Sequence, residues 1–296
     1  MKEHKLTIKD SALSFLLGFL LYQLGVIVAT CITFIIFKIS GSNMDLFESF
    51  FNSAIGYLIS TLALYLVMLL IFFYFNKAKE NQIGKRPQIK KLLLYITIAI
   101  ISFFSLYPII VCVDSLLIKC GIKISSIPYD LTTKNYFISL LSLVIAPAIC
   151  EELLFRGIIF KGLKKHGQAF AIILTSVMFT LFHMSISQTI YPLLMGLLLS
   201  VIMFYENNIY YCIAVHLTNN FLSLTLSYFK VNLIFQHWTY ILLAIFLFIA
   251  FTSVTIYLTF RKNKTHEKEK VSKEEKSYLL VVLIIMIILW FSINFL

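Results

Sequence analysis

Long apolar runs separated by short polar stretches recur from one end of the chain to the other. A helix needs about 20 mainly apolar residues to cross the hydrocarbon core of a bilayer, and most of the runs reach that length. A membrane-spanning β-barrel would instead show segments of roughly 10 residues with strict alternation, which this chain lacks. The pattern therefore predicts membrane-spanning helices at approximately 11–37, 49–75, 92–118, 136–155, 168–186, 190–205, 209–229, 238–260 and 277–296.

The connections between the fifth, sixth and seventh predicted helices are only a few residues long. Short connections make consecutive helices antiparallel neighbours, so we expect these three to pack in one bundle. A stretch of mixed charge at 261–276 is predicted to be a solvated linker or helix extension on the cytosolic side. We divide the chain into N-terminal membrane helices, a central core and C-terminal membrane helices, at 1–135, 136–229 and 230–296.

The composition agrees with this class of protein. Sixty per cent of the residues are hydrophobic and only 13% are charged, which leaves too little polar surface for a soluble protein of 296 residues. We predict an all-α integral membrane protein, a polytopic bundle of eight or nine transmembrane helices with an intramembrane polar cavity. Its main partner is the lipid bilayer.

The formal net charge of +11 does not indicate a nucleic-acid partner, because lysine and arginine lie in the gaps between apolar runs. With the N-terminus in the cytosol, 20 of the 25 basic residues fall in segments predicted to be cytosolic. Basic residues in short loops are retained on the cytoplasmic side, so the distribution favours this orientation.

Three polar motifs interrupt the apolar pattern between residues 147 and 220. In the first, helical geometry places Arg156 one turn beyond Glu152, at i and i+4, and rotates Glu151 about 100° away. Arg156 can therefore neutralise Glu152 and leave Glu151 unpaired. Desolvation makes an unpaired carboxylate more basic, which suits Glu151 to act as a general base near neutral pH. The alternative is that all three residues form a structural ion-pair cluster at the cytosolic end of the helix.

The other two motifs add imidazole and amide groups on later helices. Phe179 and His183 share one helix face, as do His216 and Asn220. Considered alone, His183 would be interpreted as a hydrogen-bonded packing residue. The His216 and Asn220 pair alone would be interpreted as a polar contact between helices. Around one cavity, the same groups with Glu151 supply a base, an acid and oxyanion donors for amide hydrolysis. Activated water is the expected nucleophile, because no serine or cysteine lies in a motif such as GxSxG.

In order and spacing, Glu151-Glu152-x3-Arg156, Phe179-x3-His183 and His216-x3-Asn220 resemble the pattern of the CPBP family. This family comprises CAAX proteases and bacteriocin-processing proteins and is also called Abi. The similarity covers roughly residues 136–222 and implies an intramembrane endopeptidase. It also implies that Glu151 activates water, that His183 holds or protonates it, and that His216 with Asn220 stabilises the oxyanion. Glu152 and Arg156 would support the site, and the Phe179 ring would wall it.

The resemblance leaves metal dependence open. The family is commonly described as metal-dependent, and Glu151 or Glu152 with His183 and His216 would supply three Zn²⁺ ligands and an open water position. The HExxH motif is absent, however, and a glutamate-activated water flanked by two histidines and an asparagine works without metal.

The predicted function is cleavage of a peptide or membrane-tethered protein, in peptide maturation or bacteriocin self-immunity. We expect the site near the cytosolic side of a bacterial cytoplasmic membrane. Two other classes remain: a non-catalytic peptide-binding immunity or scaffold protein, and a proton-coupled transporter. The lack of a visible inverted repeat argues against the transporter.

Overall fold

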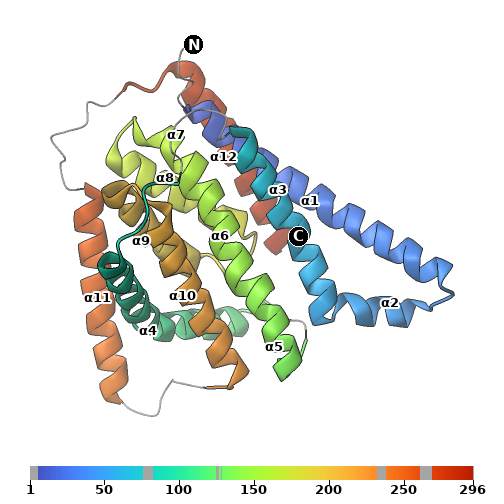
Figure 1. The fold of residues 1–296 in the computed structure, drawn as a ribbon. Helices are drawn as coiled ribbons and strands as arrows, with labels where there is room; N and C mark the ends of the chain where they lie inside the picture. The colour runs from blue at the N-terminus through green and yellow to red at the C-terminus, as the bar shows by residue number, and fades with distance from the viewer. Residues whose placement is uncertain are drawn as a thin grey trace.

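The computed structural model describes residues 6–75, 83–124, 127, 129–231, 238–260 and 269–295, and these residues form helices and their connections without a strand. Figure 1 shows the helices packed as one bundle. In chain order they are α1 (Ile8–Ile39), α2 (Met44–Phe51), α3 (Ala54–Phe75), α4 (Ile89–Lys119), α5 (Thr133–Ser139), η1 (Leu140–Ile145), α6 (Ala146–Glu152), η2 (Leu153–Ile159), α7 (Phe160–Lys164), α8 (Gln168–Phe182), α9 (Ile190–Glu206), α10 (Ile209–Tyr228), α11 (Trp238–Phe260) and α12 (Lys273–Phe295).

The predicted class, a polytopic helical membrane protein, is confirmed. Within the described residues, six helices are long and apolar enough to cross a bilayer: Ile8–Ile39, Ala54–Phe75, Ile89–Lys119, Thr133–Lys164, Leu242–Phe260 and Lys273–Phe295. Shorter apolar helices occupy Gln168–Phe182 and Ile190–Glu206. Together with α10, these helices account for each of the apolar runs in the sequence.

The predicted start of the second membrane helix, at residue 49, is wrong. A separate short helix, α2, ends at Phe51, and α3 begins at Ala54. Asn52 caps the C-terminus of α2, and the Ser53 hydroxyl accepts a hydrogen bond from the backbone N–H of Gly56 at 3.2 Å. These polar caps break the helix although the apolar run continues across them.

The fourth membrane helix is longer than the predicted 136–155 and is not a regular α-helix. It runs from Thr133 to Lys164 and contains two π-helical turns, η1 and η2, on either side of α6. A π turn is a local widening of the helix that occurs frequently at functional sites. The segment between these two turns carries both glutamates of the first motif.

Side chains of neighbouring helices bind backbone carbonyls of both π turns. Tyr65 of α3 donates to the Ser142 carbonyl at 2.9 Å, and Asn220 of α10 donates to the Leu143 carbonyl at 3.1 Å. Ser11 of α1 donates to the Ile159 carbonyl at 3.0 Å. Backbone polar groups within a membrane need protein partners, so these contacts stabilise an irregular helix there.

Helix α6 lies inside the bundle, with α3 on one side and α10 on the other (Figure 1). Helices α8 and α9 form a close hairpin beside it. A Cβ atom at Gly196 of α9 would lie only 3.1 Å from the Ser176 Cα of α8, so the absence of a side chain permits this approach. Close backbone packing therefore joins α8 to α9, and polar contacts join the central membrane helix to α1, α3 and α10.

The predicted linker at 261–276 is partly described. Residues 261–268 lie outside the described residues, and α12 begins at Lys273. In the described part, Glu269 forms an ion pair with Lys165 at 3.0 Å, and its carbonyl lies 3.1 Å from His166 Nδ1. This stretch therefore contacts the turn between α7 and α8.

Candidate active site

An ion pair between Glu152 and Arg156 lies at the centre of the polar cluster. Arg156 Nη1 donates to Glu152 Oε1 at 2.9 Å, and both side chains are fully buried. Arg156 Nη2 also donates to the Gly196 carbonyl at 3.3 Å, and the guanidinium carbon lies 4.7 Å from the centre of the Phe179 ring. The pairing expected from the i, i+4 spacing is present, although Arg156 belongs to a π turn.

His216 reaches this ion pair from α10. Its Nδ1 lies 2.8 Å from Glu152 Oε1, so one carboxylate oxygen contacts both Arg156 and His216. A carboxylate accepts hydrogen bonds, so Nδ1 of His216 carries the hydrogen in this contact. Nε2, the other ring nitrogen, lies 4.0 Å from Glu151 Oε2.

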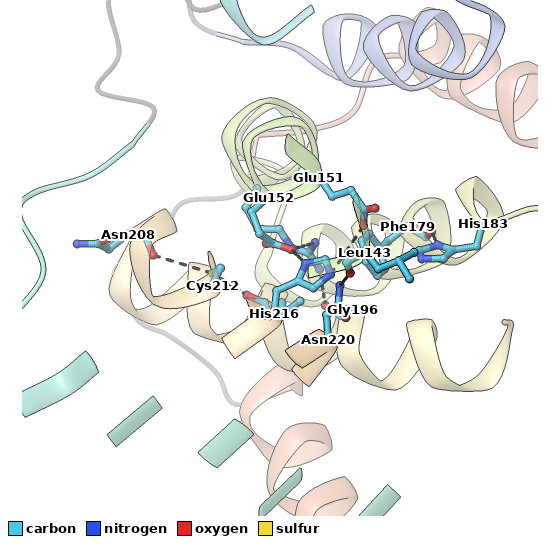
Figure 2. Close-up of polar contacts among 12 residues, drawn as sticks. Leu143, Glu151, Glu152, Phe179, His183, Gly196, Asn208, Cys212, His216 and Asn220 are labelled. Atoms are coloured by element: carbon cyan, nitrogen blue, oxygen red, sulfur yellow. Dashed lines mark hydrogen bonds and ion pairs between the residues drawn. The ribbon is translucent and has the colours of Figure 1, made fainter. Parts of the chain in front are cut away.

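Unlike Glu152, Glu151 does not form an ion pair with Arg156. Its Oε2 is buried and forms no hydrogen bond within the described residues, while 12% of its side-chain surface is exposed. Figure 2 shows both carboxylates extending from α6 toward His216. The distance of 4.0 Å is too long for a direct hydrogen bond, but a single water molecule can contact both Glu151 Oε2 and His216 Nε2.

Phe179 and His183 complete the cluster from the side of α8 (Figure 2). His183 Nδ1 lies 2.9 Å from the Phe179 carbonyl, which can only accept, so Nδ1 carries the hydrogen. The centre of the Phe179 ring lies 4.9 Å from that of His183 and 6.0 Å from that of His216. The Phe179 ring is therefore in contact with one imidazole and close to the other.

Asn220 lies one turn beyond His216, and its amide donates to the Leu143 carbonyl of η1. The neighbouring Asn219 is more deeply buried and accepts a hydrogen bond from the Tyr191 hydroxyl of α9. Sequence reasoning missed Asn219 and Tyr191, because the i, i+4 rule selected Asn220 as the partner of His216. A tyrosine near the start of a predicted membrane helix was the available signal.

The predicted zinc ligands do not form a ligand set in this arrangement. Within the described part of the chain, no group of three or more His, Cys, Asp or Glu side chains is placed to hold a metal ion. Glu152 Oε1 contacts Arg156 and His216, and His183 Nδ1 contacts a backbone carbonyl, which leaves Nε2 as the ring nitrogen of His183 that could bind a metal. Whether Glu151, Glu152, His183 and His216 bind Zn²⁺ stays a prediction.

The structure brings Glu151, Glu152, Arg156 and His216 into one cluster, and Phe179 links that cluster to His183. Glu152 Oε2 and Arg156 Nε, like Glu151 Oε2, are buried and have no hydrogen-bond partner among the described residues. Such unsatisfied groups are rare inside proteins and are accounted for by water or by a catalytic role. The fold and this cluster define a helical membrane protein with a buried polar cluster among its helices.

Comparison with known proteins agrees with this class. Residues 133–222 match the family model described as Type II CAAX prenyl endopeptidase Rce1-like. This match confirms the resemblance to the CPBP family of CAAX proteases over that segment, which is less than a third of the chain and contains all of the candidate site residues. No curated protein and no solved structure gives a significant match. The matched segment supports, in general terms, an intramembrane endopeptidase.

Proposed function

We propose that this protein hydrolyses a peptide or membrane-tethered protein substrate within the bilayer, with Glu151 as the base that activates water. The observation that carries the proposal is the difference between two adjacent glutamates. Glu152 is neutralised by Arg156, whereas Glu151 presents an unpaired carboxylate oxygen 4.0 Å from His216 Nε2. A general base needs such a free, positioned oxygen.

The reaction would begin with a water molecule between Glu151 and His216. Glu151 takes a proton from the water as its oxygen attacks the peptide carbonyl, and later returns that proton to the departing amine. The negative charge that develops on the carbonyl oxygen needs hydrogen-bond donors. The remaining N–H of the Asn220 amide would supply one donor, and His216 would supply the other as an imidazolium that enters the reaction with hydrogens on both Nδ1 and Nε2.

The other residues would fix the reacting groups. Glu152 accepts from His216 Nδ1 and so orients the ring, while Arg156 balances the Glu152 charge. The Nδ1 hydrogen of His183 leaves its Nε2 as an acceptor for the attacking water. This scheme needs no metal ion, and its residues carry every proton transfer.

The substrate is proposed by its chemistry and its route. Catalytic groups on membrane helices favour a substrate that is itself tethered to, or inserted in, the bilayer. The positive-inside distribution supports a cytosolic N-terminus, and the proposal has the site nearer that side of a bacterial cytoplasmic membrane. A CAAX-type C-terminus, with or without a prenyl group, and a bacteriocin precursor in maturation or self-immunity are the two substrate classes to test.

The decisive experiment compares wild type with Glu151→Gln, which keeps the shape of the side chain but cannot accept the proton. Glu48→Gln on the exposed face of α2 is the matched control. Purified proteins are assayed with prenylated and unprenylated CAAX peptides, and membranes from cells with each variant are compared by quantitative proteomics. Loss of the general base should lower the cleavage rate by about 10²–10⁴.

Two results would contradict the proposal. If Glu151→Gln cleaves as fast as wild type, Glu151 is not the base. If wild type cleaves nothing in either experiment, while His183→Ala and His216→Ala weaken capture of a peptide, the cluster is a binding site in a non-catalytic immunity or scaffold protein.

A further inference from the structure

We infer that Asn294, near the end of α12, is a positioning residue that holds the loop after His183 and thereby the His183 ring. This inference rests on the proposed function insofar as it concerns catalysis. Helix α12 lies outside the segment 133–222 that matches the endopeptidase family, so the contact comes from a part of the chain with no family match.

The contact is made by both ends of the Asn294 amide. Its Oδ1 accepts from the backbone N–H of Ile186 at 2.7 Å, and its Nδ2 is 3.4 Å from the Met184 carbonyl. Nδ2 also donates to the Trp290 carbonyl of its own helix at 2.7 Å, which fixes the amide orientation. A single side chain therefore bridges the backbone on either side of Ser185.

The loop needs such a contact because its backbone is strained and lies at membrane depth. Met184, directly after His183, has φ +48°, a left-handed conformation that is uncommon for a residue with a side chain. Such conformations persist where the surrounding structure holds them. Helix α8 has 15 residues, so at 1.5 Å per residue it extends about 22 Å, less than the roughly 30 Å of the hydrocarbon core. An unpaired Ile186 N–H would then face a medium without water.

The position of His183 makes the loop relevant to the active site. His183 is the C-cap of α8, adjacent to Met184, and its ring contacts the backbone and ring of Phe179 on the preceding turn. A shift of the loop would therefore move the imidazole relative to His216 and Glu151. Displacement of a catalytic group by about 1 Å can cost roughly 100-fold in rate.

The test uses the full-length protein and four substitutions. Asn294→Ala removes both contacts, and Asn294→Gln keeps a side-chain amide that can both donate and accept. Ser292→Ala is the control, because its hydroxyl donates to the Ile288 carbonyl of its own helix. Combining Asn294→Ala with His183→Ala asks whether the two residues act together.

Cleavage kinetics give the first readout. Asn294→Ala should lower kcat by about 10-fold to 100-fold with little change in KM. Asn294→Gln should recover part of the loss, and Ser292→Ala should behave as wild type. In a His183→Ala background, Asn294→Ala should cause no further loss. An equal loss in both backgrounds would overturn the inference.

Hydrogen exchange gives a readout that does not depend on proteolysis. The Ile186 amide should exchange faster in Asn294→Ala than in wild type or Ser292→Ala. Unchanged exchange would overturn the inference even if the protein is a protease. Faster exchange in a protein that cleaves no substrate would support the loop contact and reject only the proposed function.

Discussion

Removal of Arg156 should destabilise the protein unless Glu152 is neutralised at the same time. Both side chains are fully buried, and Glu152 Oε1 lies 2.9 Å from Arg156 Nη1. Arg156→Met keeps an unbranched chain of similar length but leaves the Glu152 charge without its guanidinium partner. Breaking a buried ion pair by removing one partner costs about 3–5 kcal/mol.

The expected loss of unfolding free energy lies near the lower end of this range of about 3–5 kcal/mol. His216 Nδ1 still contacts Glu152 Oε1 at 2.8 Å after the substitution and retains part of the stabilisation. The contact between Arg156 and the Phe179 ring is also lost, and a desolvated cation–π contact contributes about 2 kcal/mol. We expect Arg156→Met to lower the free energy of unfolding by about 3 kcal/mol.

The double variant Glu152→Gln with Arg156→Met tests whether the unpaired Glu152 charge causes the loss of stability. Replacing both members of a buried pair by neutral side chains of similar size is often close to neutral, so most of the loss should be recovered. The double variant should then lose much less stability than the sum of the losses measured for Glu152→Gln and Arg156→Met alone. Reversible unfolding of the purified protein in mixed micelles with increasing SDS measures each free energy.

Glu206→Gln is the control for these variants. Glu206 pairs with Lys91 at 2.6 Å, but the Lys91 side chain is 44% exposed, so water screens the charges. This substitution should cost much less than Arg156→Met. Equal losses for the two variants, or a double variant as unstable as Arg156→Met alone, would refute the argument from burial.

Two further predictions concern helix packing and metal. Gly162→Ala should destabilise the protein by about 1–3 kcal/mol in the same unfolding assay, because a Cβ there would lie 2.1 Å from Ser11 Oγ. Gly25→Ala is the control and should be tolerated, because the nearest atom to its Cβ would lie 3.4 Å away. Equal stability of the two variants would contradict this packing. Treatment with 1,10-phenanthroline should leave cleavage unchanged, because the proposed reaction uses none of the candidate ligands to bind metal. Loss of activity that returns with Zn²⁺, with bound zinc detected by elemental analysis, would reject the metal-free scheme.

Much of the architecture could be predicted because the bilayer restricts the choices. A chain with apolar runs of this length has to satisfy its backbone hydrogen bonds internally, and helices do so within each run. The Glu152–Arg156 pair was also predictable, because a separation of four residues places side chains on one helix face. Both predictions depend on local geometry.

The features that could not be predicted depend on contacts between distant segments. Tyr65, Asn220 and Ser11 bind backbone carbonyls of the π turns from three other helices, and no spacing within 133–164 indicates them. Asn294 was missed for the same reason, since its partners lie more than 100 residues earlier in the chain. The break between α2 and α3 was missed because the apolar run hides its short polar caps.

The two π turns around α6 also change how this helix can evolve. Each π turn accommodates one residue more than an α-helical turn, and one residue corresponds to about 100° of rotation. Deleting a residue from η1 would turn Glu151 and Glu152 relative to α5, and deleting one from η2 would turn them relative to α7. The facing direction of the two carboxylates is thus set by helix register as well as by residue identity, and a single-codon deletion beside them can disable the site while every polar residue is retained.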